Sequence, residues 1–242
     1  MNESRYELGN FTDDSDHSLK ESETDIPLMR SPFQLVELSI VMLGLFVFVF
    51  LVGEIAFAIP IIYVLMDSKC RGRKTADLGF KQTGLTEDLK RNAGLIVFSV
   101  VVLQGLIVWG GLLLIPSYID YVAANRAWSV NMGFEIFFLM LFSIPLTTLL
   151  EEIVFRGLLQ ERLSWYIGQK TAISIASMLF AAIHWAPSGS LIWLVDMIAI
   201  ASGGFVYGVI YMRCRSVYVT WFAHVLADLH GIFLLFLIFN IL

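Results

Sequence analysis

The chain has 242 residues, of which 57% are hydrophobic and only 15% charged, and its mean hydropathy is +0.75. Soluble domains carry roughly 25% charged residues, so this composition excludes an ordinary soluble domain and predicts an all-α, polytopic membrane helical bundle. The net charge of −5 equals that of residues 1–33 alone, which hold eight acidic and three basic residues. The remainder is neutral and carries no basic stripe, so we expect no nucleic-acid partner.

Changes in composition divide the chain into three predicted parts. Residues 1–33 are polar and acidic and predict a disordered tail. Residues 34–132 predict N-terminal membrane helices with a basic loop at 67–92, and residues 133–242 predict the membrane core. About six membrane helices are expected, at residues 35–65, 93–115, 134–163, 171–185, 191–212 and 216–239, with a loop at 116–131.

The first expected span, residues 35–65, is longer than the ~20 residues that a bilayer requires. We therefore expect this span to tilt or to kink at Pro60, because proline is a common cause of helix kinks. The alternative is a re-entrant segment or a hairpin that breaks at Pro60. The choice between them decides on which side of the membrane the N-terminal end lies.

The orientation of the bundle follows from its Lys and Arg residues. The loop at 67–92 holds seven of them, and the positive-inside rule places it in the cytoplasm. With six spans both chain ends lie outside, whereas a hairpin at Pro60 would move the N-terminal end to the cytoplasm. Cys70 and Cys214 lie between basic residues on this side and are interpreted as reduced, free thiols, with lipidation as the alternative.

The most informative stretch is residues 151–156, whose sequence EEIVFR places three charges inside a predicted membrane helix. A charge at bilayer depth costs at least ~2.5–3.5 kcal/mol, so residues of this kind usually serve a function. On a helix, Glu152 and Arg156 are four positions apart with the glutamate first, which favours an ion pair. Glu151 is turned about 100° away and points elsewhere.

Two further predicted helices bring titratable side chains to a similar depth. The fourth span carries His184, and the sixth carries His224 and Asp228, four positions apart on one face. If the third helix continues to about Leu163, Glu151 lies roughly 18 Å into the membrane and His184 roughly 20 Å. A glutamate that takes a proton from water, with an imidazole as partner, would activate that water for hydrolysis. Alternatively, the same four side chains would bind a zinc-like divalent ion that acidifies its bound water.

Three motifs, in this order, resemble those of the CAAX-protease and bacteriocin-processing (CPBP, or Abi) family of membrane peptidases. EExxxR stands at residues 151–156, FxxxH at 180–184, and HxxxD, one form of the family's HxxxN or HxxxD motif, at 224–228. The resemblance covers about residues 134–230. It implies that the C-terminal part of the chain is a catalytic membrane core built on four helices.

The resemblance implies roles for the first two motifs. Glu151 would be the base that activates water, with His184 as its partner. Glu152 and Arg156 would be structural and substrate-orienting residues. The alternative for the first motif is a buried structural ion triad, and for His184 a purely packing role.

The resemblance also implies a second polar cluster, in which His224 and Asp228 would stabilise an oxyanion or bind a metal. Members that resemble the eukaryotic CAAX endopeptidases usually have Asn where Asp228 stands. An amide donates a hydrogen bond to an oxyanion, whereas an ionised Asp only accepts. The departure favours metal binding, or an aspartate that orients His224. The alternative reading of this pair is an interhelical polar clamp.

Other polar or small residues in the expected spans belong to no motif. Glu54 and Asp196 are each predicted to form a hydrogen bond between helices, and His230 is predicted to be structural. Gly204 and Gly208 form a small-residue surface that predicts close packing of two helices.

Together these features predict a multi-pass integral peptidase of the cell membrane, embedded in membrane lipid, whose active site opens toward the cytoplasm. It would cleave a peptide or a prenylated protein near the membrane surface, as in CAAX processing or bacteriocin maturation. Two other classes stay open: a non-proteolytic membrane scaffold or immunity protein of the same fold, and a proton-coupled transporter that relays protons through buried Glu, His and Asp. A transporter more often contains inverted repeats, and the sequence shows none.

Overall fold

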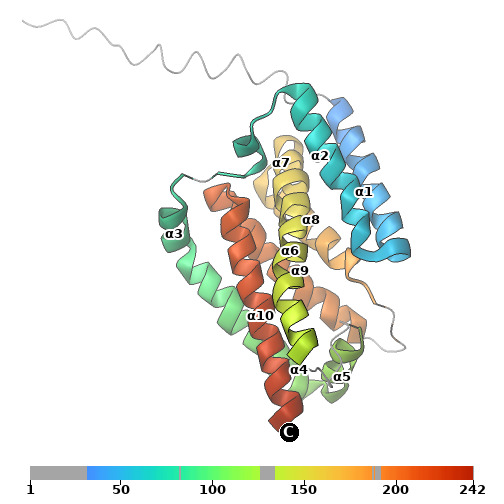
Figure 1. The fold of residues 1–242 in the computed structure, drawn as a ribbon, viewed down its shortest axis with the longest axis vertical. Helices are drawn as coiled ribbons and strands as arrows, with labels where there is room; N and C mark the ends of the chain where they lie inside the picture. The colour runs from blue at the N-terminus through green and yellow to red at the C-terminus, as the bar shows by residue number, and fades with distance from the viewer. Residues whose placement is uncertain (1–31, 82, 126–133, 187, 189–191, 242) are drawn as a thin grey trace, which may run out of the picture.

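The structure, a computed structural model, describes residues 32–81, 83–125, 134–186, 188 and 192–241. Within these ranges the chain is almost entirely helical and has no strand, so the predicted all-α class is confirmed (Figure 1). Among the described residues, four helical segments are long and apolar enough to cross a membrane: Pro32–Arg71, Leu85–Leu114, Ile192–Cys214 and Val217–Ile238. The protein is an integral membrane helical bundle. The predicted disordered tail lies outside the described residues, except for its last two.

The first expected span is a pair of antiparallel helices. Helix α1 covers Pro32–Val52, the 3-10 segment η3 covers Gly53–Phe57, and α2 covers Ala58–Arg71. At the end of α2, Arg71 Nη2 donates to both carboxylate oxygens of Glu37, near the start of α1, at 2.9 Å. The two helices therefore lie side by side, as the blue and cyan ribbons of Figure 1 show. The single-span interpretation is wrong, and the hairpin alternative is correct.

The hairpin reverses at Gly53 and not at the expected Pro60. Gly53 has a φ of +65°, in the left-handed region that glycine adopts without steric cost. Pro60 is the third residue of α2, in the first turn, where its missing N–H has no intrahelical partner to lose. As a result, the start of α1 lies at the same end of the bundle as the 67–92 segment.

The second expected span starts earlier than predicted, and the loop after it is largely helical. The span consists of α3 (Leu85–Val97), the π-helical segment η5 (Phe98–Leu103) and α4 (Gln104–Leu114). Helix α5 (Pro116–Asn125) occupies most of the predicted loop, whose last residues, 126–131, lie outside the described chain. Tyr118 and Tyr121 are one helical turn apart, and both bury against Ile238 of the last helix, which explains why this segment is ordered as a helix.

The helix that carries the first motif is long and continuous, as predicted. It consists of α6 (Phe134–Glu152), the π-helical segment η6 (Ile153–Gln160) and α7 (Glu161–Ile167). The expected extension to about Leu163 is therefore confirmed, and the helix ends before Gly168, which has a φ of +78°. The π-helical turns directly after Glu152 have no counterpart in the prediction. Such turns are rare and frequently lie at functional sites.

The last three helices pack closely around small residues. They are α8 (Gln169–Ile183), α9 (Ile192–Cys214) and α10 (Val217–Ile241). A Cβ atom at Gly208 would lie 2.9 Å from both Gln160 Oε1 and Ile173 Cγ2, and one at Gly204 would lie 3.2 Å from Phe180 Cδ1. Neither position has space for a larger side chain, so the predicted small-residue packing surface is confirmed.

The two ends of the bundle differ in character. At the start of α10, Val217 N donates to Gly79 O of the basic segment at 2.8 Å. Near the other end of α10, Ile238 packs against Tyr118 of α5. The basic 67–92 segment and α5 therefore lie at opposite ends, separated by the length of α10 (Figure 1). At the basic end, Cys70 and Cys214 are free thiols, as expected, the first exposed and the second buried.

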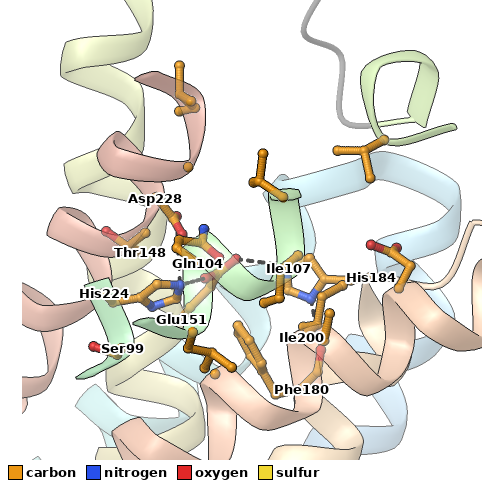
Figure 2. Close-up of a pocket in the computed structure, with 18 of the residues that line it drawn as sticks. Ser99, Gln104, Ile107, Thr148, Glu151, Phe180, His184, Ile200, His224 and Asp228 are labelled. Atoms are coloured by element: carbon orange, nitrogen blue, oxygen red, sulfur yellow. Dashed lines mark hydrogen bonds and ion pairs between the residues drawn. The ribbon is translucent and has the colours of Figure 1, made fainter. Parts of the chain in front are cut away.

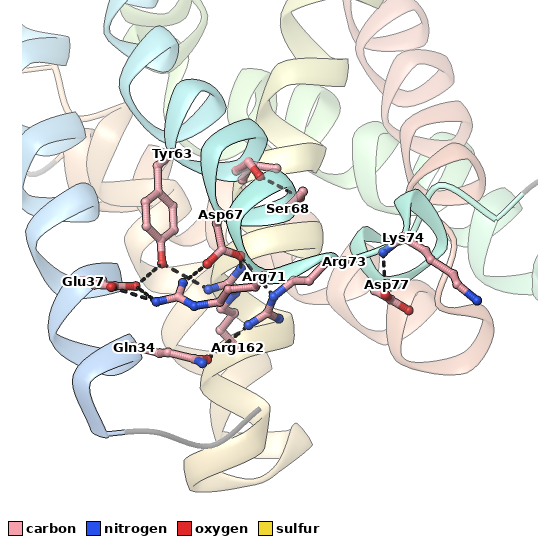
Figure 3. A network of polar contacts seen from close by, with 11 residues as sticks. Gln34, Glu37, Tyr63, Asp67, Ser68, Arg71, Arg73, Lys74, Asp77 and Arg162 are labelled. Atoms are coloured by element: carbon pink, nitrogen blue, oxygen red, sulfur yellow. Dashed lines mark hydrogen bonds and ion pairs between the residues drawn. The ribbon is translucent and has the colours of Figure 1, made fainter. Parts of the chain in front are cut away.

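A buried ion network ties the N-terminal hairpin to the motif helix at the basic end (Figure 3). We call it the Asp67 network, and its charged and phenolic members are Glu37, Tyr63, Asp67, Arg71, Arg73 and Arg162. Asp67 is 4% exposed, accepts hydrogen bonds from Arg71 and Arg162, and forms an ion pair with Arg73 Nε at 3.1 Å. Because Arg162 belongs to α7, this network fixes the hairpin against the core.

Candidate active site

Glu151 lies between two histidines that come from different helices (Figure 2). Its Oε1 is 3.4 Å from His184 Nε2, at the end of α8, and its Oε2 is 3.7 Å from His224 Nε2, on α10. The side chain of Glu151 is 15% exposed, so water reaches it although it lies within the bundle. The three motifs therefore meet at one carboxylate, as the depth argument predicted.

The orientation of His184 is set by its own helix. Its Nδ1 lies 2.8 Å from the carbonyl oxygen of Phe180, one turn earlier. A carbonyl only accepts, so Nδ1 carries the proton and Nε2, the nitrogen that faces Glu151, is the basic position of the neutral ring. Phe180 also packs against both histidine rings, at centroid distances of 4.7 Å from His184 and 5.7 Å from His224. The FxxxH spacing thus fixes the tautomer and the ring plane together.

Glu152 points away from Glu151 and holds the second histidine. Its Oε1 lies 2.9 Å from His224 Nδ1, and its Oε2 lies 3.4 Å from Arg156 Nε. An ionised carboxylate only accepts, so His224 donates from Nδ1 and presents Nε2 to Glu151 and to the cavity. The predicted Glu152–Arg156 ion pair is therefore present, and Glu152 orients His224 as well.

Arg156 is completely buried, and its surroundings are unusual for a guanidinium. Its exposure is 0%, and none of its three side-chain nitrogens has a hydrogen-bond partner within the described residues; the 3.4 Å approach to Glu152 is an ion pair without hydrogen-bond geometry. The group lies over the rings of Phe180, at 5.2 Å, and Tyr207, at 5.9 Å, where the π faces partly compensate a cation. Arg156 is thus a cation held beneath the site without saturated hydrogen bonds.

Asp228 lies on the opposite side of His224 from Glu152. Its Oδ2 is 3.7 Å from His224 Nε2, and its side chain is 36% exposed. Because Glu152 already holds Nδ1 of this ring, Asp228 is not needed to fix the tautomer. Asp228 instead adds a second carboxylate to the space in front of Nε2.

A cavity of about 460 Å³ begins at these side chains. It is lined by Glu151, His184, His224 and Asp228, whereas Glu152 and Arg156 lie behind its wall. From there the cavity continues to Tyr118, Val122 and Asn125 of α5, at the end of the bundle opposite the basic segment. The expected cytoplasmic orientation and the side on which the site opens stay predictions.

The predictions for polar residues outside the motifs have different outcomes. Asp196 lies 3.4 Å from the hydroxyl of Tyr118 on α5, which confirms the predicted bond between helices. His230 contacts Val100 O at 2.5 Å, which agrees with a structural role. Glu54, at the tip of the hairpin, forms no hydrogen bond or ion pair with any residue that the structure describes and instead lines the cavity. The predicted helix–helix bond of Glu54 is therefore not seen among the described residues and stays a prediction.

A metal site was the alternative reading of the four lining residues. In the described part of the chain, no group of three or more His, Cys, Asp or Glu side chains has an arrangement that could hold a metal ion. The carboxylates and imidazoles approach one another in pairs at 3.4–3.7 Å. Metal binding stays a prediction, and no step below depends on it.

Several residues that shape the site were not recognised in the sequence. Tyr207 stacks on His224 at 4.5 Å, and Gln104, from α4, donates to Ala227 O at 3.2 Å beside Asp228. Thr148 lines the cavity one turn before Glu152. Only Tyr207 had a sequence signal, because it adjoins the glycine-rich packing surface. Gln104 is one of two polar residues, with Ser99, in an apolar span, which is a weak indication by itself.

Comparison with known proteins supports the family resemblance indicated by the three motifs. A family model described as Type II CAAX prenyl endopeptidase Rce1-like matches residues 133–230. No curated protein and no solved structure matches the chain significantly. The matched residues contain all three motifs and begin where the predicted catalytic core begins. Residues 133–230 are thus an Rce1-like segment, and the resemblance of the chain to the CAAX-protease and bacteriocin-processing family is confirmed.

Proposed function

We propose that the protein is an intramembrane endopeptidase that hydrolyses a peptide bond with water activated by Glu151 and His184. The observation that carries this proposal is the convergence of three helices on Glu151, with His184 Nε2 at 3.4 Å and His224 Nε2 at 3.7 Å, inside one cavity. A scaffold needs no water-accessible carboxylate between two oriented imidazoles, and a transporter needs a path through the bundle. Among the described residues, the cavity lining extends from the site to residues of α5.

The proposed reaction follows from the positions of these groups. A water molecule between Glu151 and His184 gives a proton to Glu151 while its oxygen attacks the carbonyl carbon of the substrate. The carbonyl oxygen becomes negative on the side of His224, whose Nε2 faces the same space and donates to the oxyanion when the ring is an imidazolium, protonated at both nitrogens. When the C–N bond breaks, the proton held by Glu151 and His184 passes to the leaving nitrogen. The products are a new carboxylate and a new amine, and no redox step is involved.

The Rce1-like match supports a substrate with a prenylated C-terminal CAAX sequence, and the apolar surroundings of the site are compatible with a lipid-modified peptide. The test uses purified protein in detergent, a farnesylated CAAX peptide and the same peptide without the prenyl group. We expect cleavage of the farnesylated peptide by the wild type and none by Glu151→Gln. Equal cleavage of both peptides would redirect the proposal to peptide maturation, and cleavage by Glu151→Gln would contradict the catalytic assignment.

The metal question has its own measurement in the same preparation. Elemental analysis of active protein, with and without dialysis against a chelator, reports the metal content independently of turnover. Activity that persists at less than one metal ion per several molecules supports the glutamate–histidine mechanism. Activity that is lost on chelation and restored by a zinc-like ion would replace it with metal-activated water.

We also propose that the basic end faces the cytoplasm, because the loop at 67–92 holds seven Lys and Arg residues. The cavity then runs toward the non-cytoplasmic half of the membrane. In a background lacking Cys70 and Cys214, a cysteine at the exposed Asp120 of α5 should react with an impermeant thiol reagent in intact cells, and one at the exposed Glu87 of α3 should not. The opposite labelling pattern would reverse the orientation.

A further inference from the structure

The proposed reaction needs more hydrogen-bond donors than the motif residues supply. Oxyanions of acyl transfer are stabilised by preorganised N–H or O–H groups that point at the developing charge. In the second cluster, Asp228 as a carboxylate only accepts, and His224 commits Nδ1 to Glu152 at 2.9 Å. Only Nε2 of His224 is left to face the substrate, and it donates only when the ring is an imidazolium. A site that has Asp in place of an amide therefore lacks one donor.

A side-chain amide lies where this donor is missing. Gln104 is the first residue of α4, in a part of the chain that the Rce1-like match does not include. Its Nε2 donates to Ala227 O at 3.2 Å, so the amide lies against α10 next to Asp228. Gln104 lines the same cavity as Glu151 and Asp228, and Figure 2 shows its amide beside both carboxylates.

The two helices around this amide are shaped to admit it. A Cβ atom at Gly231, three residues after Asp228, would lie 2.4 Å from Gln104 Nε2, so only glycine leaves space for the amide there. The π-helical segment η5 ends immediately before Gln104. A primary amide nitrogen carries two N–H groups, and the bond to Ala227 O uses one of them. The second N–H is left for a ligand in the cavity.

We propose that Gln104 is a catalytic residue that donates a hydrogen bond to the oxyanion, in place of the amide that Asp228 lacks. The inference rests on the proposed peptidase function. The hydrogen-bond donor to the oxyanion is then Gln104 of α4. Helix α10 supplies a carboxylate, Asp228, at the position where an amide would otherwise be the donor. The peptide carbonyl would then be held between Gln104 Nε2 and His224 Nε2, opposite the water at Glu151.

The test exchanges the two side chains. Gln104→Glu removes the N–H groups and keeps the shape, Asp228→Asn supplies an amide at the other position, and the double variant restores one amide and one carboxylate with an unchanged net charge. Gln160→Met is the matched control, because Gln160 Nε2 also donates to a backbone carbonyl, Gly208 O at 2.9 Å, but does not line the cavity. We measure kcat and KM on a peptide that the wild type cleaves, with a melting temperature for each variant.

We expect Gln104→Glu to lower kcat by about 10²–10³-fold, the effect of removing one oxyanion donor, with a much smaller change in KM. The double variant should recover kcat by at least about tenfold over Gln104→Glu. Gln160→Met should lower only the melting temperature.

Near-wild-type kcat in Gln104→Glu, or a folded double variant no better than the single one, would overturn the inference while leaving the peptidase intact. A wild type that cleaves no peptide would remove the peptidase and this inference together. If Gln104→Glu does not fold, Gln104→Met with and without Asp228→Asn gives the same comparison.

Discussion

The bundle contains two buried groups of charged residues, and they differ in how completely their hydrogen bonds are made. In the Asp67 network every carboxylate oxygen faces a guanidinium or a phenol, and Arg73 and Arg162 also lie over the Trp165 ring at 5.2 and 5.6 Å. Around Glu151 the closest approaches to the two imidazoles are 3.4 and 3.7 Å. Arg156 has no hydrogen-bond acceptor within the described chain.

The difference indicates different tasks. A fully satisfied buried network rigidifies the structure around it, because each member would be costly to leave unpaired. An incompletely satisfied group is held in place by the surrounding helices, and its unused donors and acceptors are available to water or substrate. We interpret the Asp67 network as the structural fastening of the hairpin and the Glu151 cluster as the reactive site.

The sharpest way to break this comparison is to make one conservative change in each group. Glu151→Gln and His184→Ala should each lower the cleavage rate by at least about 100-fold, because a general base contributes 10²–10⁴-fold. The double variant should be little worse than either single one, since residues that act as a unit fail together. Glu151→Gln should melt close to the wild type. Robust cleavage by Glu151→Gln, or strict additivity, would contradict the assignment.

Asp67→Asn should have the opposite signature. Asp67 is buried and faces three guanidinium groups, and burial together with the charges of Arg162 and Arg71 already lowers the pKa of Arg73 to about 10. Arg71 keeps Glu37, but removing the buried anion leaves Arg73 and Arg162 without a carboxylate, which costs roughly 3–5 kcal/mol. Thermal unfolding should reveal this loss, with a near-normal rate for each folded molecule. A stable variant with a lost rate would mean that the hairpin acts in catalysis.

The sequence predicted the core of the site better than its surroundings, for a physical reason. Glu152 and Arg156, or His224 and Asp228, are four positions apart, and helix geometry fixes such neighbours wherever the helix lies. The reversal at Gly53 could not be predicted, because its positive φ becomes favourable only when α2 packs back along α1.

That Gln104 belongs to the site could not be predicted from the sequence either, because it depends on which face of α4 meets α10. A π-helical segment lies directly before Gln104 and another directly after Glu152, and each changes which face the following helix presents. No residue pattern predicts these segments. The direction of the cavity likewise depends on α5, a helix in a segment predicted as a loop. Local periodicity therefore gave the motif contacts, whereas the non-motif lining depends on tertiary packing.

A smaller effect is expected from Arg156→Met, which replaces the buried guanidinium by an apolar chain of similar length. The guanidinium has no hydrogen bonds to lose, and Glu152 Oε2 already has no hydrogen-bond partner among the described residues, so Arg156→Met removes only the 3.4 Å ion pair, and we expect a stability loss of about 1–3 kcal/mol. Activity should fall more than stability, because the ion pair with Arg156 no longer holds Glu152 in place, and the orientation of His224 depends on Glu152. A loss in unfolding free energy as large as that of Asp67→Asn would show that Arg156 belongs to a satisfied network.

The smallest effect should come from Glu37→Gln, within the Asp67 network itself. Glu37 binds Arg71 through both oxygens at 2.9 Å, a better geometry than any contact of Glu151, but the two side chains are 22% and 31% exposed. Exposed ion pairs contribute about 0–1 kcal/mol, because water already solvates both charges and the pairing restricts two side chains. Glu37→Gln should therefore lower the unfolding free energy by at most about 1 kcal/mol, and less at high salt, where exposed charges are screened. Urea unfolding of Glu37→Gln and Asp67→Asn at low and high salt makes the comparison within one network and with the same chemical change. Equal losses at the two positions would mean that burial does not set the strength of this network, and the distinction between a satisfied fastening and a reactive site would then need another physical basis.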